Sequence, residues 1–218
     1  MEREIATIAL VRHGRSTAND DPRVYLTTPD HAIPLARPDD DPDALSAGDR
    51  LAALGFDPAD VCSWRSPYLR CVQTEVLVMR RAIGVGFERI SRRESFMLRE
   101  QEFGDWDGLD EAEMQALDPV KYARRARMTD YRGRFYFRYP SGESRADVVQ
   151  RLSIFLGKLH RTHFRHHVIF LHGVTQRAFR MAWFNSSSDW FEAEPNPGNA
   201  SVLVIKRDHE HKWVESFV

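Results

Sequence analysis

Short runs of apolar residues alternate with longer segments in which apolar residues recur every three to four positions. Residues 5–11 are β-branched and nearly all apolar, which is typical of a central strand buried on both faces. Similar runs predict further strands at residues 59–64, 85–90, 167–171, 200–205 and 213–217. The run at residues 85–90 is the weakest, and the last two runs predict a hairpin.

The segments between these runs predict helices and loops. Ser46, with Asp49 three residues later, resembles a capping box, and the helix that follows stops at Gly55. Further helices are predicted at residues 67–84, at residues 111–127 as one or two short helices, after residue 142 and from about residue 174. Residues 20–43, rich in Asp and Pro, predict a long surface loop that is either solvated or substrate-facing.

Strands and helices alternate from end to end, with no linker and no internal repeat. This order predicts an α/β fold, a three-layer α/β/α sandwich with a largely parallel central sheet, and a single domain over residues 1–218. Two predicted strands end in a histidine followed by a glycine, at His13 and His172. Ligands of open α/β sheets bind beyond the carboxyl ends of the strands. If the two strands are neighbours, the two histidines face each other across one pocket.

Charge and cysteine content narrow the class of protein. The formal net charge is −1, so there is no overall electrostatic case for binding nucleic acid or an anionic membrane. No apolar run approaches the length of a membrane span. The cysteines are Cys62 and Cys71, and the amino-terminal segment is too short and too charged for a signal peptide. Two thiols without such a leader predict reduced cysteines and a cytoplasmic protein.

Charged motifs follow the apolar runs in a fixed order. Arg12-His13-Gly14 comes directly after the first predicted strand, with Ser16 and Asn19 behind it. The later motifs are Ser66-Pro67-Tyr68-Leu69-Arg70 with Gln73-Thr74, the acidic loop at residues 98–108, Pro140-Ser141-Gly142-Glu143-Ser144, and Phe170-Leu171-His172-Gly173. Together they resemble the histidine phosphatase superfamily, which includes cofactor-dependent phosphoglycerate mutase. The resemblance spans about residues 5–205 and implies a phosphoglycerate mutase-like fold.

The chemistry of phosphoryl transfer explains why these residue types occur together. His13 is the expected nucleophile, and an imidazole attacks phosphorus only through a neutral nitrogen, so its other nitrogen must be held as a donor. Arg12 and Arg70 offer forked donors for the phosphoryl oxygens, and His172 adds a third cation if it is protonated.

Neutral donors are expected to complete the phosphate site. They are Asn19, Ser16 and the start of the helix after Gly173, whose positive end would point at the phosphate. Asn19 could instead serve only as a helix cap.

The resemblance also implies a proton donor for the leaving group. By motif register this residue is Glu100, with Glu102 and Asp105 as close rivals. The implied activity is that of a metal-independent phosphomonoesterase, with no cofactor and no metal, acting on a small phosphorylated substrate. Inorganic phosphate or sulfate would occupy the same site. Four neighbouring histidines, at positions 160, 163, 166 and 167, are an alternative but weak metal motif.

A phosphatase is favoured over a mutase by one departure from the mutase pattern. Where phosphoglycerate mutases have Gly-Leu-Asn-Lys, with a lysine that holds the substrate carboxylate, this chain has Gly108-Leu109-Asp110-Glu111. Residues 29–35 and 132–140 look more like plant and fungal phosphoglycerate mutase-like proteins of the phosphatase branch. A mutase and an inactive phosphate-binding module remain alternatives. Residues 124–139 either line the mouth of the site or form a solvated helix and a core-facing strand.

Overall fold

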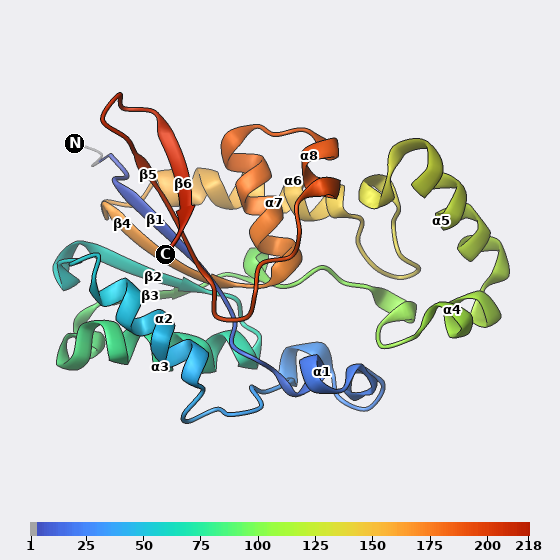
Figure 1. Ribbon diagram of the computed structural model, residues 1–218, viewed down its shortest axis with the longest axis horizontal. Helices are drawn as coiled ribbons and strands as arrows, with labels where there is room; N and C mark the ends of the chain where they lie inside the picture. Colours follow the sequence, from blue (N-terminus) through green and yellow to red (C-terminus); the bar gives the residue numbers. More distant parts are fainter. Residues whose placement is uncertain (1–3) are drawn as a thin grey trace.

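A mixed sheet forms the centre of the computed structural model, which describes residues 4–218 apart from the side chains of residues 130–132. Within this part of the chain the sheet has six strands in the order β3-β2-β4-β1-β5-β6 (Figure 1). Their bounds are β1 (Thr7–Arg12), β2 (Val61–Arg65), β3 (Ser91–Glu94), β4 (His166–Leu171), β5 (Val202–Arg207) and β6 (Trp213–Phe217). The first four are parallel, and β5 and β6 form the predicted antiparallel hairpin at one edge.

Two layers of helices cover the two faces of the sheet. Helices α2 (Pro42–Ala52) and α3 (Leu69–Ile83) pack on one face, and α6 (Arg145–His160) and α7 (Gly173–Phe184) pack on the other. The remaining helices are α1 (Thr17–Asp20), α4 (Glu111–Leu117), α5 (Pro119–Arg132) and α8 (Ser188–Ala193). The prediction of a three-layer α/β fold with a largely parallel sheet is therefore confirmed.

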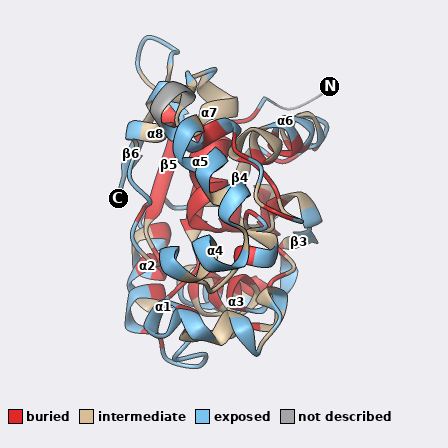
Figure 2. Ribbon diagram, turned by 90° about the vertical axis from the view of Figure 1, so that its right-hand side faces the viewer, coloured by how far each residue is buried: buried red, intermediate tan, exposed pale blue. Residues whose placement is uncertain are grey.

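Strand β1 shows why a continuous apolar run makes a central strand. Ile8 and Leu10 point into the core under α6 and α7, whereas Ala9 and Val11 point into the core under α2 and α3. All four side chains are fully buried, and the inner part of the sheet is coloured as buried in Figure 2. Burying one such aliphatic side chain stabilises the fold by about 1.5–3 kcal/mol.

Two predicted elements are wrong in detail. Residues 85–90 do not form a strand, because the segment Gly84–Arg89 is a 3₁₀ helix and the strand that pairs with β2 is Ser91–Glu94. Gly84 has φ of +60°, which turns the chain out of an extended path, and only Phe87 of this 3₁₀ helix is buried. The edge strand is polar, so the hydrophobic pattern did not reveal it.

The second wrong detail is the start of α2. The helix begins at Pro42, and the Asp41 side chain caps it by accepting hydrogen bonds from the amides of Asp43 and Ala44. Ser46 therefore lies inside the helix rather than at its cap. Asp followed by Pro is the stronger signal for the start of a helix. The Asp side chain caps the first amides, and proline at the first helical position loses no hydrogen bond, because the amide at that position has no partner within the helix.

Helices α4 and α5 form an arm beside the carboxyl ends of the strands (Figure 1). Asp118 and Pro119 mark the break between the two helices. Of the two predicted arrangements for residues 111–127, one helix or two, the structure has two. No residue of α4 is buried. Within the described chain, no helix has both the length and the apolar character needed to cross a membrane.

Candidate active site

The two histidine motifs meet because their strands are neighbours. Strands β1 and β4 are parallel and in register, with Arg12 opposite Leu171, so the residues that follow lie side by side. The ring centroids of His13 and His172 are 5.2 Å apart. Both residues are buried, with exposed fractions of 4% for His13 and 0% for His172. The sequence prediction that these rings face each other agrees with the structure.

His13 has one ring nitrogen fixed as a donor. Nδ1 lies 2.7 Å from the carbonyl oxygen of Gly14, which can only accept, so the proton is assigned to Nδ1 and the lone pair to Nε2. Burial lowers the pKa of His13 well below its usual range, and the charges of Arg70 and Arg12 lower it further. The imidazole is therefore neutral, as attack on phosphorus requires.

The loop after β1 is held from several sides. The amide of Gly14 donates to Thr74 Oγ1 at 2.9 Å, and the side-chain amide of Asn199 donates to the Gly14 carbonyl at 3.1 Å. A Cβ atom at position 14 would lie 2.7 Å from a carboxylate oxygen of Asp41, so a larger residue would displace this loop. These contacts keep the carbonyl of Gly14 aimed at His13.

Two arginines approach the histidine pair. The guanidinium of Arg12 donates to the carbonyl of Pro197, and that of Arg70, which is 1% exposed, donates to Asp30 Oδ1 at 2.7 Å and to the Asp30 carbonyl at 2.8 Å. The Nε atoms of both arginines are buried and have no hydrogen-bond partner among the described residues. Buried donors are normally paired, so these two are available for an anionic ligand.

The sequence makes His172 a third cation only if its ring is protonated. Burial, followed by the charges of Arg70 and His13, lowers the pKa of His172 well below its usual range, so the ring is a neutral donor and not a third cation. Its Nε2 lies 2.9 Å from Ser66 Oγ, while its Nδ1 is buried without a partner among the described residues. The unpaired Nδ1 joins the two arginine Nε atoms as a third buried polar atom around His13.

Glu100 occupies the start of α7. Its Oε1 accepts from the amides of Gln101 and Thr175 at 3.0 and 3.2 Å, and its Oε2 accepts from the amide of Val174 at 3.3 Å. The Thr175 hydroxyl lies 3.1 Å from Oε1 but has a shorter contact, 2.8 Å, with the carbonyl of Arg99. The prediction that the first turn of α7 points its amides at a phosphate is therefore wrong for Val174 and Thr175. Of the two oxygens, Oε2 has the fewer donors.

The two rivals of Glu100 lie elsewhere. Glu102 is paired with Arg99 through a contact of 3.3 Å, and its side chain is 51% exposed. Asp105 accepts from the Ser141 hydroxyl at 2.9 Å. Neither carboxylate contacts the start of α7, so the geometry favours Glu100.

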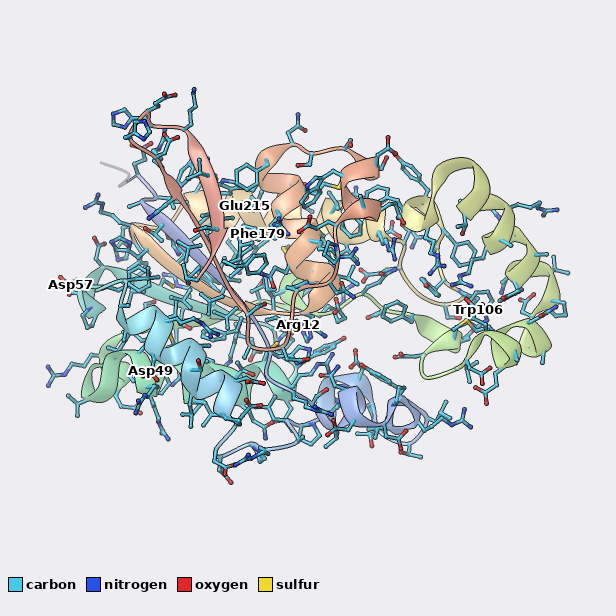
Figure 3. All side chains as sticks on the ribbon, viewed as in Figure 1. Arg12, Asp49, Asp57, Trp106, Phe179 and Glu215 are labelled. Carbon is cyan, nitrogen blue, oxygen red and sulfur yellow. The ribbon has the colours of Figure 1, made fainter. Side chains whose placement is uncertain are left out.

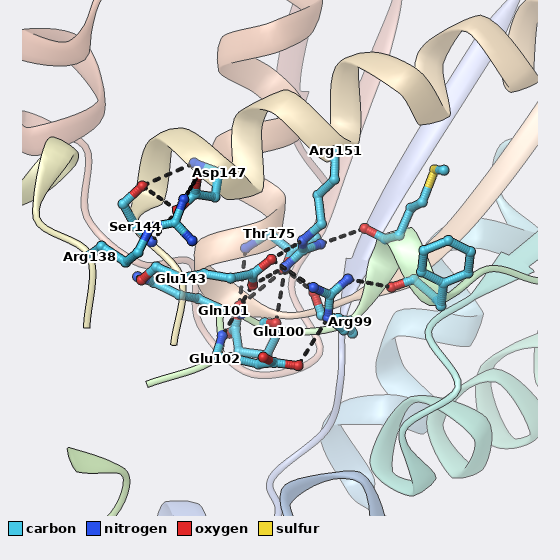
Figure 4. A network of polar contacts seen from close by, with 12 residues as sticks. Arg99, Glu100, Gln101, Glu102, Arg138, Glu143, Ser144, Asp147, Arg151 and Thr175 are labelled. Carbon is cyan, nitrogen blue, oxygen red and sulfur yellow. Dashed lines mark hydrogen bonds and ion pairs between the residues drawn. The ribbon is translucent and has the colours of Figure 1, made fainter. Parts of the chain in front are cut away.

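A buried ion-pair network holds the backbone around Glu100 (Figure 4). Glu143 accepts from Arg99 at 2.7 Å and from Arg151 at 3.0 Å. Arg151 also donates to the Glu100 carbonyl at 3.0 Å. The motif at residues 140–144 thus contributes to the site indirectly, by positioning the acidic loop.

Ser16 and Asn19 form one unit. The Ser16 hydroxyl donates to Asn19 Oδ1 at 3.0 Å, and the side-chain amide of Asn199 donates to the same oxygen at 2.9 Å. The Ser16 proton is thus used to hold Asn19 and is not aimed at a phosphate, contrary to expectation. Asn19 is part of the first turn of α1 and is exposed. Its side-chain NH₂ is the group that is left to donate a hydrogen bond to a ligand.

Gly173 lies against Arg12. A Cβ atom at position 173 would lie 3.6 Å from the guanidinium carbon of Arg12 and 3.2 Å from Asn196 Oδ1. The contact with Arg12 is an ordinary van der Waals distance, whereas the Asn196 side chain would have to shift by a few tenths of an ångström to admit a Cβ atom.

Three residues of the site were missed by sequence reasoning. Asp30 pairs with Arg70, Asn199 holds the loop after β1, and Asp107 is a partly buried carboxylate close enough to be affected by Glu100 and Arg70. Through Asp30, the segment at residues 20–43 reaches the site. Asp and Asn are common in loops, so their presence in the sequence was no signal for these contacts.

The four neighbouring histidines do not converge. The rings at positions 160, 163 and 166 lie against Trp183, Phe164 and Phe56, and His167 accepts a hydrogen bond from the Trp64 indole at 3.2 Å. Within the described chain, no group of three His, Cys, Asp or Glu side chains is arranged to hold a metal ion.

Comparisons with known proteins agree with this geometry. The family model of the histidine phosphatase superfamily (branch 1) matches residues 8–218. The phosphoglycerate mutase-like protein AT74 of Arabidopsis thaliana is 38% identical over 221 residues, which cover 91% of this chain and 64% of that protein. The broad-range acid phosphatase DET1 of Saccharomyces cerevisiae is 34% identical over 120 residues, or 51% of this chain and 33% of that protein.

Solved structures show the same fold. YhfR of Bacillus stearothermophilus matches with a TM-score of 0.72 and 24% identity, covering 95% of this chain and 94% of that one. A mycobacterial glucosyl-3-phosphoglycerate phosphatase in complex with VO3 matches with a TM-score of 0.72 and 24% identity, covering 97% of both chains. Together with the match of the family model over almost the entire sequence, these similarities establish that the chain belongs to branch 1 of the histidine phosphatase superfamily.

Proposed function

We propose that the protein is a metal-independent phosphomonoesterase that works through a phosphohistidine on His13. One observation supports this most directly: a neutral His13, with Nδ1 fixed on the Gly14 carbonyl, lies among three side chains that each have an unpaired buried nitrogen. These side chains are Arg12, Arg70 and His172. Two guanidinium groups and a neutral N–H suit the three equatorial oxygens of a phosphoryl group in transfer.

The first step forms the phosphoenzyme. His13 Nε2 attacks phosphorus while the bond from phosphorus to the ester oxygen breaks, and Glu100 Oε2 gives a proton to the leaving alkoxide. The Gly14 carbonyl stabilises the positive charge that develops on the ring of His13. In the second step a water molecule attacks phosphorus, Glu100 takes a proton from that water, and His13 is released with inorganic phosphate.

A phosphatase is proposed rather than a mutase for an electrostatic reason. Asp110, at the position of the mutase asparagine, caps α4 through the amide of Glu113, and Glu111, at the position of the mutase lysine, pairs with Arg125. An exposed glutamate that is already paired with an arginine offers no cation to hold the carboxylate of a phosphoglycerate. The similarity to a yeast protein named as a broad-range acid phosphatase supports the same choice. Because Cys62 and Cys71 are both free and buried, we further propose a cytoplasmic location.

The test is hydrolysis of an aryl phosphate in the presence of a chelator, combined with quenching in denaturant at alkaline pH and intact-mass measurement of the protein. We expect turnover that survives the chelator and an added phosphoryl group of the kind that is lost on mild acid treatment. His13→Ala should remove both. Turnover that requires a metal, or an unphosphorylated protein during turnover, would refute the mechanism. Primer-dependent isomerisation of phosphoglycerate that exceeds hydrolysis would identify a mutase instead.

A further inference from the structure

A cavity of about 500 Å³ lies between the acidic loop, the arm and the 3₁₀ helix Pro22–Leu26. Its walls include the aromatic side chains of Tyr25, Phe103, Trp106 and Tyr139. Figure 3 shows Trp106 next to the ribbon of α4, to one side of Arg12 at the end of the sheet. Asp107 follows Trp106 and also lines the cavity.

Electrostatic coupling connects this cavity to the phosphate site. Burial raises the pKa of Tyr25 to about 12, while the positive charge of Arg70 opposes that rise. Burial raises the pKa of Asp107 to about 6, with further increases from Asp30 and Glu100 and a decrease from Arg70. Two side chains that line the cavity, Tyr25 and Asp107, are therefore within electrostatic range of Arg70.

The position of Glu100 shows which part of a substrate would enter. Glu100 belongs to the same loop as Phe103, Trp106 and Asp107, so this loop contributes both the proposed acid and one wall of the cavity. A general acid must stand beside the oxygen that leaves. A cavity walled by the loop that carries the proposed acid is therefore the one suited to the leaving alcohol.

The charges of the cavity are mainly negative. Asp107 and Asp110 line it, and its cation, Arg23, is paired with Glu113 through contacts of 2.6 and 2.8 Å. Among the described residues, no lining cation is left unpaired to receive a carboxylate. Aromatic surface favours an apolar or ring-bearing group, while the carboxylates disfavour an anionic one.

We propose that this cavity binds the leaving alcohol, that it selects uncharged, ring-bearing alcohols, and that Asp107 is the residue that discriminates against alcohols carrying a carboxylate. This inference rests on the proposed phosphatase function. It goes beyond that function because it assigns a substrate class and a specificity-determining residue.

The experiment compares two esters that differ in one charge, phenyl phosphate and 4-carboxyphenyl phosphate. We expect kcat/KM of the wild type to be about ten-fold higher for phenyl phosphate, and Asp107→Asn to reduce that ratio about five-fold. Asp107→Glu, which keeps the charge, should keep the ratio, so that a general effect on folding is separated from an effect of charge. Asp105→Asn is the matched control, because Asp105 lies in the same loop but pairs with Ser141.

The outcomes separate the two proposals. Equal kcat/KM values for the two esters in the wild type would overturn the inference and leave the phosphatase function standing. An Asp107→Asn variant that loses activity on both esters with an unchanged ratio would likewise overturn the role of Asp107. If neither ester is hydrolysed by the wild type, the proposed function itself has failed.

Discussion

Ser66 Oγ lies 2.9 Å from Nε2 of His172. The Ser66 hydroxyl oxygen also accepts the amide of Tyr68 at 3.3 Å, and we assign its proton to the contact with Nε2. The Cys71 thiol, 3.5 Å from Nε2, is a weaker second donor. The ring proton of His172 is then on Nδ1, the nitrogen that is buried without a partner among the described residues.

We therefore predict that Ser66→Ala weakens phosphate-ester hydrolysis about ten-fold, since one buried hydrogen bond contributes about 1 kcal/mol and orients the donor. The readout specific to this role is the ¹⁵N shift of the His172 ring, which should show a mixture of tautomers in the variant. Ser66→Thr should restore the rate. Ser63→Ala is the control, because Ser63 is a buried serine on β2, the strand that ends just before Ser66, but donates to Glu75. An unchanged His172 spectrum in Ser66→Ala would contradict the assignment.

Arg70 is expected to be irreplaceable by lysine. Its guanidinium binds Asp30 through Nη1 and keeps Nε for the ligand, a division that a single ammonium group cannot reproduce. Arg70→Lys should lower kcat/KM at least about ten-fold and weaken inhibition by inorganic phosphate. Arg81→Lys on the same helix, where an exposed arginine pairs with Asp49, should change neither quantity. Similar inhibition constants for Arg70→Lys and wild type would rule out Arg70 as a phosphate ligand.

Glu143 is expected to act only through the position of Glu100. Glu143→Gln removes a charge that Arg99 and Arg151 share, and the loop around Glu100 should loosen. We expect kcat to fall about ten-fold on an alkyl phosphate and much less on an activated aryl phosphate, whose leaving group needs little protonation. The exposed Glu102 provides the control variant, Glu102→Gln. An equal loss on both substrates would indicate a loss of folded protein rather than of proton transfer.

Stability is expected to fall as the pH is lowered from 7 towards 5. The pKa values of His13 and His172 are lowered in the folded protein, and burial lowers that of His167 to about 4. These histidines bind fewer protons in the folded protein than in the unfolded protein, so their contribution to the free energy of unfolding is complete above about pH 6.5. Below about pH 6.5, each histidine loses up to about 1.4 kcal/mol of this contribution per pH unit.

Asp107 acts in the opposite direction, since its raised pKa lets the folded protein bind a proton below about pH 6. One such carboxyl does not offset three histidines. Urea unfolding curves measured at half-unit steps of pH provide the measurement. A free energy of unfolding that stays constant or increases between pH 7 and 5 would contradict this balance of charges.

Several features of the fold could be predicted because they depend on local pattern. The apolar run at β1 must be buried on both faces, and this holds whichever helices pack against it. The sequence was therefore sufficient to identify a central strand. The polar edge strand Ser91–Glu94 was missed because backbone pairing with β2 stabilises it and its side chains, intermediate or exposed, leave no apolar period. The start of α2 was misplaced because two capping signals competed and only one was used.

The sequence by itself determined the α/β class, the order of the five motifs and the candidate residues Arg12, Arg70 and His172 around His13. Tertiary structure alone decided the charge of His172, the use of the α7 amides by Glu100, and the pairing of Asp30 with Arg70, which are 40 positions apart. The physical reason is that backbone pattern and residue type are local properties of a chain. Burial, and the partner of each donor, depend on what the rest of the chain places nearby.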